Sequence, residues 1–198
     1  REEEHKLVNN KAMTVCRGLV TFLFNHFGGE GMDRKKAAVI MGSDSDFPVV
    51  RKAAEALKEF GIPFEMRVLS AHRSPKEVAE FAQSARANGF GVIIAAAGMA
   101  AHLAGAIAGN TTLPVIAIPV KAKALEGVDA LLSSVMMPPG VPVATVGIDA
   151  AANAGYLAAE ILAVSDDSIA EKLLAFKKKQ NEKNLAADAK MQETAKEI

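Results

Sequence analysis

The sequence predicts a three-layer α/β/α sandwich built on a parallel sheet. Short apolar runs alternate with segments of helical spacing between residues 36 and 165, and Gly or Pro marks most of the boundaries. Of the 198 residues, 50% are hydrophobic but only 5% are aromatic, which suits tight packing of Ala, Val, Ile and Leu. Unbroken apolar runs of strand length are typical of parallel strands, and consecutive β-α units place helices on both faces of the sheet.

Five apolar runs are predicted to be strands. The first, AAVIM, stops at the sequence GSDSD, where a strand gives way to a helix. The fourth contains VIAIPV and is too apolar to lie at an edge of the sheet. The predicted strands cover residues 37–41, 63–69, 91–97, 114–120 and 141–148.

The segments that follow the strands have helical spacing. Pro48 fits the first turn of the first helix, and Gly61 fits its C-cap. Pro75 opens the second helix and Gly89 ends it. The predicted helices cover residues 47–60, 76–88, 100–108, 128–136 and 151–163.

Two terminal segments differ from this pattern. Residues 1–32 begin with three glutamates, unlike the basic start of a secretory signal peptide, and are predicted to be an N-terminal extension or leader outside the fold. Residues 33–165 form the predicted α/β domain. Residues 166–198 are charged, with a partial apolar stripe, and predict a projecting helix that packs on a neighbouring subunit or, alternatively, a solvated tail.

Charge and cysteine content narrow the function classes. The chain has 23 basic and 23 acidic residues, which does not favour a nucleic-acid or membrane-surface binder. Residues 90–109 lack formal charge, but Gly98, Gly105 and His102 interrupt them, so a buried strand and helix are expected instead of a membrane span. The single Cys16 rules out an internal disulfide and suits a cytoplasmic location.

Four loops follow predicted strands and are therefore expected to meet at one edge of the sheet. Ligands bind at this edge in open α/β sheets, beside helix N-termini that favour anions. The four loops cover residues 42–46, 70–73, 98–102 and 121–127.

These loops carry residue types suited to a phosphorylated sugar. Ser43 and Ser45 supply hydroxyl donors, and Asp46 suits ribose hydroxyls, although it would equally serve as a helix N-cap. Arg73 offers a fork for phosphate. His72 suits proton transfer at neutral pH, although a lone loop histidine is more often structural.

The loop at residues 98–102 is expected to present no bulky side chain before His102, so that a flat ring could lie against its backbone. His102 itself suits either a structural role or one wall of that ring site. The chain has no G-x-G-x-x-G after the first strand, no P-loop and no G-x-S-x-G. His72 and His102 lack an acidic partner at ligand spacing, so no metal or organic cofactor is expected.

The chain carries GSDSD at 42–46, SAHRSP at 70–75, AGMAAHLAG at 97–105 and PV…ALEGVDALLSSVMMPPGVPVAT over 119–145. In this order and spacing the four motifs resemble the 5-(carboxyamino)imidazole ribonucleotide mutase family of purine (IMP) biosynthesis, also known as the catalytic subunit of phosphoribosylaminoimidazole carboxylase. The resemblance covers residues 36–165. It implies a flavodoxin-like fold and a cytoplasmic homo-octamer whose sites use more than one subunit.

The resemblance also implies a reaction and its residues. The carboxylate would move from the exocyclic nitrogen to C4 of the imidazole ribonucleotide by decarboxylation, retention of CO2 and recarboxylation, without a cofactor. His72 matches the catalytic proton shuttle. The matching substrate-binding positions are Ser43 and Arg73 for the phosphate, Asp46 for the ribose, and Ser45, Ser70, Gly98, Ala101 and His102 along the pocket.

Some positions depart from the family pattern, and rival functions stay open. Lys121-Ala122 replaces a frequent Gln-Ser, Met136 replaces a common Gln, and Ala130 replaces a Ser. The nearest rival is the second class of the family, which carboxylates aminoimidazole ribonucleotide directly with CO2, but that class carries Ala-His-Lys where this chain has Ala71-His72-Arg73. A flavin- or nucleotide-binding module and an assembly scaffold are the remaining alternatives.

Overall fold

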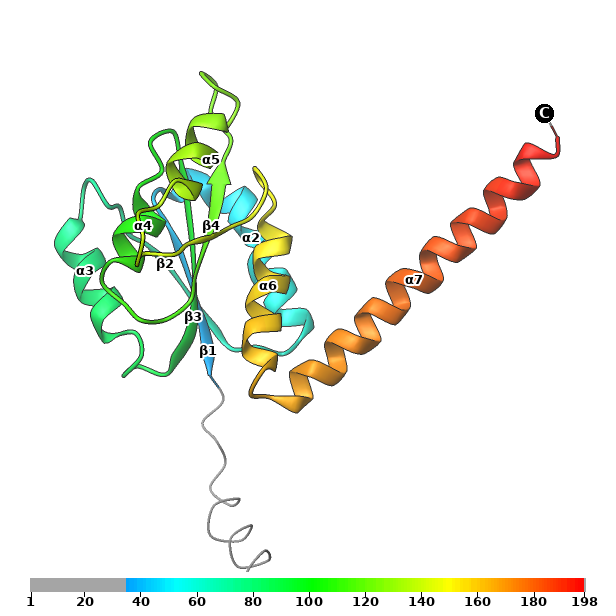
Figure 1. Ribbon diagram of the computed structural model, residues 1–198, viewed down its shortest axis with the longest axis horizontal. Coiled ribbons are helices and arrows are strands. Elements are labelled where there is room, and N and C mark those ends of the chain that lie inside the picture. The colour runs from blue at the N-terminus through cyan, green and yellow to red at the C-terminus, as the bar shows by residue number, and fades with distance from the viewer. Residues whose placement is uncertain (1–34, 198) are drawn as a thin grey trace, which may run out of the picture. The chain divides into compact units, whose positions relative to one another are not determined.

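The computed structural model describes residues 35–197, and the predicted extension at 1–32 lies outside them. One sheet contains five parallel strands in the order β2-β1-β3-β4-β5, and helices flank it (Figure 1). The elements are β1 (Lys36–Met41), a 3-10 turn η1 (Asp44–Asp46), α2 (Phe47–Glu59), β2 (Phe64–Val68), α3 (Pro75–Ser84), β3 (Phe90–Gly98), α4 (Leu103–Ala108), β4 (Val115–Val120), α5 (Val128–Val135), β5 (Ala144–Thr145), α6 (Ala151–Ala163) and α7 (Asp167–Ala195).

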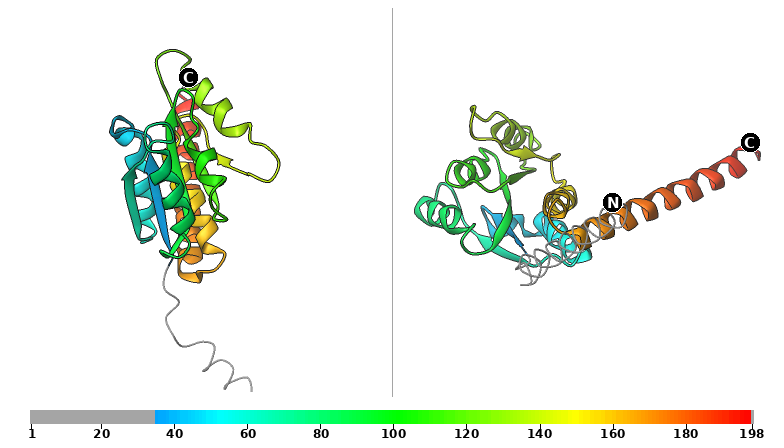
Figure 2. Two further views of the ribbon diagram at one scale, coloured as in Figure 1. Left: turned by 90° about the vertical axis from the view of Figure 1, so that its left-hand side faces the viewer. Right: turned by 60° about the horizontal axis from the view of Figure 1, so that its bottom comes forward.

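The sheet has a hydrophobic core on each face, as the predicted sandwich requires. Along β1, Val39 belongs to the core under α2 and α6, whereas Ile40 belongs to the core under α3 and α4. This alternation follows from the two-residue period of a strand. The two further views of Figure 2 show helices covering both faces of the sheet.

Residues 90–109 confirm the prediction of a buried strand and helix, because they form β3 and α4. Within residues 35–197, no helix combines the length and the apolarity that crossing a membrane requires. The apolar character of this stretch instead reflects β3 at the centre of the sheet, paired with β1 and β4.

The predicted boundaries are wrong in three places. The fifth strand is only Ala144–Thr145 instead of 141–148; Pro142 lacks an N–H, and Asp149 turns with φ 56°. The third helix begins at Leu103 instead of residue 100, because Met99 has φ 53°. The second helix ends at Ser84, whose hydroxyl donates to the carbonyl of Glu80, and turns replace residues 85–88 of the prediction.

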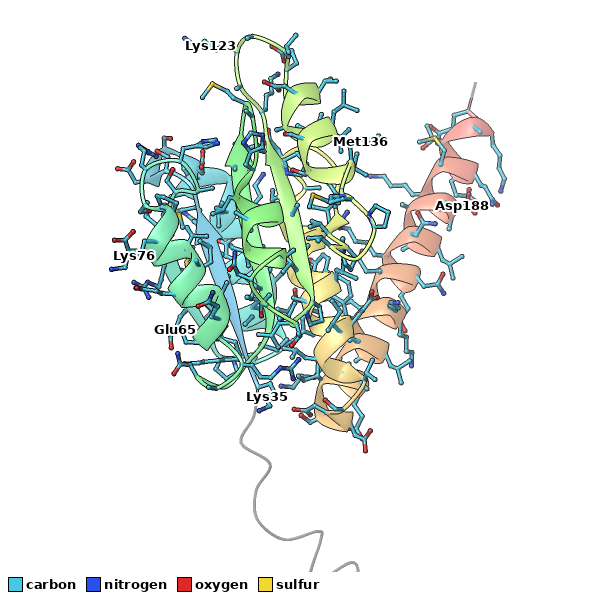
Figure 3. All side chains as sticks on the ribbon, turned by 60° about the vertical axis from the view of Figure 1, so that its left-hand side comes forward. Lys35, Glu65, Lys76, Lys123, Met136 and Asp188 are labelled. Carbon is cyan, nitrogen blue, oxygen red and sulfur yellow. The ribbon has the colours of Figure 1, made fainter. Side chains whose placement is uncertain are left out.

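Helix α7 is anchored at its start and then projects beyond the sandwich (Figures 1 and 3). Ile169 and Leu173 are its buried residues, and the ring of Phe176 packs edge-on against Phe60 at 5.6 Å between centroids. Lys172 Nζ donates to the Phe60 carbonyl at 2.8 Å. From residue 177 to residue 197 every residue is exposed, although Lys177 Nζ still pairs with Glu160 of α6 at 3.0 Å.

Gly155 allows the close approach of α6 to α2, and its substitution tests this packing. A Cβ at this position would lie 2.7 Å from both the Ala53 carbonyl oxygen and the Ala56 Cβ. We expect Gly155→Ala to lower the free energy of unfolding by about 1–3 kcal/mol, because overpacking outweighs the helix propensity of Ala. Urea unfolding measures the change.

Gly109→Ala is the matched control, because its added Cβ would meet no atom closer than 3.5 Å. Its stability should stay near that of the unaltered chain. A Gly155→Ala variant as stable as the control would contradict the account of the α2–α6 contact.

Candidate active site

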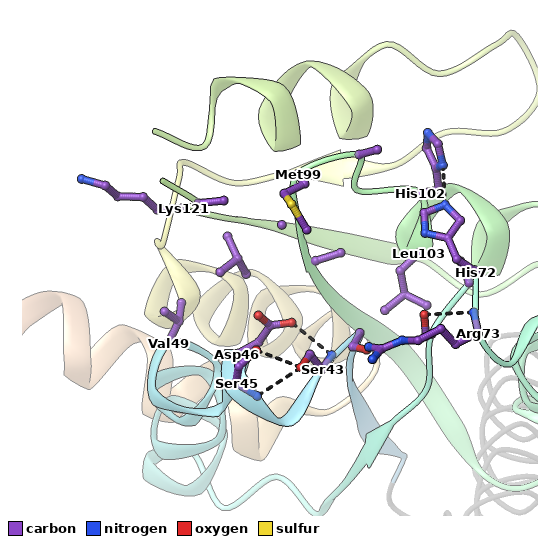
Figure 4. Close-up of a pocket in the computed structure, with 18 residues that line it drawn as sticks. Ser43, Ser45, Asp46, Val49, His72, Arg73, Met99, His102, Leu103 and Lys121 are labelled. Carbon is purple, nitrogen blue, oxygen red and sulfur yellow. Dashed lines mark hydrogen bonds between the residues drawn. The ribbon is translucent and has the colours of Figure 1, made fainter. Parts of the chain in front are cut away.

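A pocket of about 700 Å³ opens at the carboxyl ends of β1, β2, β3 and β4 (Figure 4). Its lining comes from the four loops that the sequence analysis expected to meet there. The residues that line it are Gly42, Ser43, Ser45, Asp46, Val49, Ser70, Ala71, His72, Arg73, Ala97, Gly98, Met99, Ala100, His102, Leu103, Val120, Lys121 and Ala122.

The loop after β1 is organised by a capping box. The Ser43 backbone N–H donates to Asp46 Oδ2 at 3.2 Å, and Ser43 Oγ accepts from the Ser45 backbone N–H at 3.3 Å. Ser45 Oγ also donates to Ser43 Oγ at 2.8 Å. Three polar side chains are thereby held together at the entrance to α2, where backbone N–H groups favour an anion.

Asp46 is the carboxylate of this loop, and its environment disfavours its charge. Burial is the main cause and raises the pKa of Asp46, and the neighbouring Asp44 acts in the same direction. The Ser43 N–H and the positive charge of Arg73 oppose the shift but do not cancel it. Asp46 thus combines a capping role with an acceptor that is half-buried at the pocket wall.

The loop after β2 places Arg73 against the end of β1. Ser74 Oγ accepts from the Ser70 backbone N–H at 2.9 Å, and Ser70 Oγ accepts from the Arg73 backbone N–H at 3.2 Å. Arg73 Nη2 donates to the Gly42 carbonyl at 2.6 Å. This hydrogen bond holds the guanidinium beside the Ser43 loop. It leaves other N–H donors of the five in the guanidinium available to a ligand.

His72 and His102 form a pair. Their Nε2 and Nδ1 atoms lie 2.8 Å apart, and the ring planes are inclined by 80°. A hydrogen bond at this distance requires one ring to donate and the other to accept, so the two nitrogens share one proton. Figure 4 shows the pair at one end of the pocket, with the other ring nitrogen of His72 directed away from His102.

The turn after β3 differs from the predicted one, which had no bulky side chain before His102. Met99 is a bulky side chain, lines the pocket and has φ 53°, so the expectation of no large group before His102 is wrong. Ala101, which was predicted to contact substrate, is buried outside the pocket lining, and its backbone N–H donates to Ser133 Oγ at 3.0 Å. Ala101 therefore joins this turn to α5.

Lys121 stands at the opposite end of the pocket from the histidines (Figure 4). Its backbone N–H donates to Asp149 Oδ1 at 2.9 Å, and its ammonium pairs with the Glu126 carboxylate. This hydrogen-bonded pair raises the pKa of Lys121, which keeps the side chain cationic.

Eight of the nine predicted site residues line one pocket: Ser43, Ser45, Asp46, Ser70, His72, Arg73, Gly98 and His102. The sequence did not predict Val49 and Val120, which are apolar residues of the lining. Their apolar character matched that of core residues, so the sequence held no signal for them. No group of three or more His, Cys, Asp or Glu within residues 35–197 is arranged to hold a metal ion.

Comparison with known families decides the relationship. The family described as AIR carboxylase matches residues 36–183. The chain belongs to the AIR carboxylase family. All four pocket loops lie inside the matched region.

Curated AIR carboxylase relatives include proteins named N5-carboxyaminoimidazole ribonucleotide mutase. The protein of Methanocaldococcus jannaschii is 55% identical over 158 residues, which are 80% of this chain and 98% of that protein. The protein of Mycobacterium tuberculosis H37Rv is 49% identical over 163 residues, covering 82% of this chain and 94% of that protein. A relative from Vigna aconitifolia named chloroplastic phosphoribosylaminoimidazole carboxylase is 46% identical over 170 residues, but this chain covers only 30% of it.

A solved structure shares the fold of this chain. The crystal structure of Treponema denticola PurE aligns with a TM-score of 0.73 at 31% identity, covering 79% of this chain and 98% of that chain. This likeness confirms the predicted α/β sandwich with its parallel sheet.

Asp46 generates a prediction about the pH dependence of stability. Its raised pKa means that the folded state binds the proton more tightly than the unfolded state, so ionisation of Asp46 above its ordinary pKa of 3.8 lowers stability. Asp46→Asn cannot ionise. We expect the stability difference, variant minus unaltered chain, to become more favourable to the variant as the pH rises from below 3.8 to neutral.

Urea unfolding of both proteins at several pH values measures this difference, in which the titration of groups far from Asp46 cancels. Asp44→Asn, at an exposed position in the same loop, is the control and should show a weaker trend. A difference that is flat or falls with pH would contradict the assignment of burial as the main cause.

Proposed function

We propose that this chain is an N5-carboxyaminoimidazole ribonucleotide mutase, an isomerase of de novo purine biosynthesis. It converts 5-carboxyaminoimidazole ribonucleotide to 4-carboxy-5-aminoimidazole ribonucleotide. The single observation that carries the proposal is the 55% identity to a protein of that name over 98% of its length. The convergence of a histidine, an arginine and a capped serine loop in one pocket supports the same chemistry.

The arrangement of polar groups supports one orientation of the substrate. Ser43 and Arg73 would take the phosphate, because a hydroxyl donor and the remaining N–H groups of the fork are adjacent at the entrance to α2. Asp46 would accept from the ribose hydroxyls. The heterocycle would then point toward His72, with Ser45, Ser70, Gly98 and His102 lining the space between.

The proposed reaction needs positioning and one mobile proton. An aminoimidazole is electron-rich at C4, so this carbon can attack CO2 without metal activation. The exocyclic nitrogen gains a proton when its carboxylate leaves, and C4 loses one after recarboxylation, so a single histidine can donate the first proton and accept the second. Proximity in well-oriented systems contributes up to about 7–11 kcal/mol, and a positioned base roughly 10²–10⁴-fold.

The pairing of the two histidines supports His72 as the proton carrier and His102 as its positioning residue. His72 Nε2 is engaged with His102 Nδ1 at 2.8 Å, which leaves the other nitrogen of His72 for the substrate. Because the bond constrains the tautomers of both rings, His102 would hold that nitrogen in the form that reacts.

A homo-oligomer, with the octamer as the expected assembly in the cytoplasm, completes the proposal. Residues 166–198 would pack on a neighbouring subunit, and residues 33–165 would form the catalytic domain. Exposed apolar side chains on α5 and α7 support such contacts, because isolated solvent-facing helices rarely carry so many: Val128, Leu132, Val135, Leu174, Leu185 and Met191.

Direct carboxylation of aminoimidazole ribonucleotide is the second candidate. It is favoured by the name of the Vigna aconitifolia relative, phosphoribosylaminoimidazole carboxylase. Arg73, in place of the lysine expected of the carboxylating class, favours the mutase.

The two candidates are separated by an assay of the purified chain with two substrates. The mutase should turn over the carboxyamino ribonucleotide without added bicarbonate and should use the decarboxylated ribonucleotide with bicarbonate poorly. The opposite preference would assign direct carboxylation. No turnover of either substrate would contradict both the mutase and the carboxylase proposal.

His72→Asn tests the proton shuttle. We expect turnover to fall by at least the roughly 10²-fold that a positioned base contributes, with substrate affinity and oligomeric state preserved. Steady-state kinetics and calorimetric titration measure the two quantities. His26→Asn is the control that lies outside the described residues and should leave turnover unchanged, whereas near-normal turnover in His72→Asn would exclude His72 as the shuttle.

A further inference from the structure

Met99 is the long, flexible apolar side chain in the turn between β3 and α4, and it lines the pocket. The lining combines polar residues such as Ser43, Asp46 and Arg73 with apolar ones. Met99 follows Gly98, which pairs with the lining residue Val120 across β3 and β4, and 64% of Met99 is exposed. In Figure 4 its thioether lies between Lys121 and the histidine pair, over the interior of the pocket.

The backbone at Met99 is strained, and its neighbours hold it in that state. Its φ of 53° lies in the left-handed region, which L-residues other than Asn and Asp seldom adopt. The Ala101 N–H donates to Ser133 Oγ, and the His102 N–H donates to the Ala100 carbonyl at 2.9 Å. On the other side, a Cβ on Gly98 would meet the Val120 carbonyl oxygen at 3.2 Å.

Glycine would adopt this backbone conformation without strain, so a methionine here costs stability. Its exposure means that little core packing offsets that cost. Backbone strain of this kind concentrates at functional sites, which indicates a functional role for the Met99 side chain in the pocket.

The proposed reaction contains a step for which an apolar closing group is suited. CO2 is free after the N–C bond of the carbamate has broken and before the C–C bond at C4 has formed. It has no charge, no hydrogen-bond donor and no net dipole, so a pocket retains it by excluding water and closing the exit. A thioether chain with three rotatable bonds adapts to such a small apolar guest.

We propose that Met99 closes the pocket at the ends of β3 and β4 over CO2 and retains it until C4 attacks; this rests on the proposed mutase function. When the N–C bond breaks, its electron pair stays on nitrogen, which takes a proton from His72. C4 then uses a ring electron pair to bond the carbon of CO2, and the proton of C4 passes to the deprotonated His72. One carboxylate moves, and no oxidant, reductant or net proton is consumed.

The test follows the carbon of the carboxylate. The purified chain of residues 1–198 is given 5-carboxyaminoimidazole ribonucleotide with heavy carbon in the carbamate carboxyl, in excess unlabelled bicarbonate. Mass spectrometry of the 4-carboxy product measures the retained label. We expect the unaltered chain to retain most of the label and Met99→Gly to lose several-fold more, with Tm unchanged or raised by about 2–4 °C.

Label retention is the labelled fraction of the product. Misfolded enzyme therefore lowers the reaction rate but leaves this fraction unchanged. Met99→Leu should restore retention, because it returns apolar bulk to the same strained backbone. Val164→Ala is the control: Val164 is 89% exposed at the end of α6, outside the pocket lining, and its truncation should leave retention unchanged.

Equal retention in Met99→Gly and the unaltered chain would overturn the proposal. Equal loss in Met99→Gly and Met99→Leu would also overturn it, because apolar bulk would then not be what holds CO2. Failure of the proposed function is a separate result, in which the unaltered chain forms no 4-carboxy product at all.

Discussion

The parallel pairing of the central strands is the constraint on which the site depends. Met41 at the end of β1 pairs with Val68 on one side and Ala96 on the other, and Gly98 of β3 pairs with Val120 of β4. These registers bring the strand ends to nearly one level. The loops that leave them therefore share a single edge, although Ser43 and Lys121 are 78 positions apart in the sequence.

Two short hydrogen bonds hold the loops at that edge together around the pocket. Arg73 is tied to the Gly42 carbonyl at the end of β1, and His72 is tied to His102 after β3. Each bond joins loops from different strands, so the cation and the imidazole are positioned by the sheet as a whole. The fold thus supplies preorganisation, which is the main requirement of a reaction that needs proximity and proton transfer by a single histidine.

The site retains features that oppose stability. Burial disfavours the charge of Asp46, and Met99, Glu126 and Asp149 are the non-glycine residues with positive φ within residues 35–197. All three border the pocket: Met99 lines it, Glu126 pairs with Lys121, and Asp149 accepts from the Lys121 N–H. Unusual backbone conformations and a desolvated carboxylate thus occur where the chemistry is proposed. The two hydrophobic cores, one on each face of the sheet, provide stability that offsets their cost.

The sequence by itself determined the layer architecture, the four loops of the pocket and eight of its residues, because apolar periodicity and parallel topology dictate where loops emerge. The tertiary structure alone decided how those residues meet. The His72–His102 bond joins positions thirty residues apart, and the bulk of Met99 enters the pocket only because its neighbours impose a left-handed backbone. The burial of Ala101 likewise depends on Ser133 from α5, a contact that no local pattern encodes.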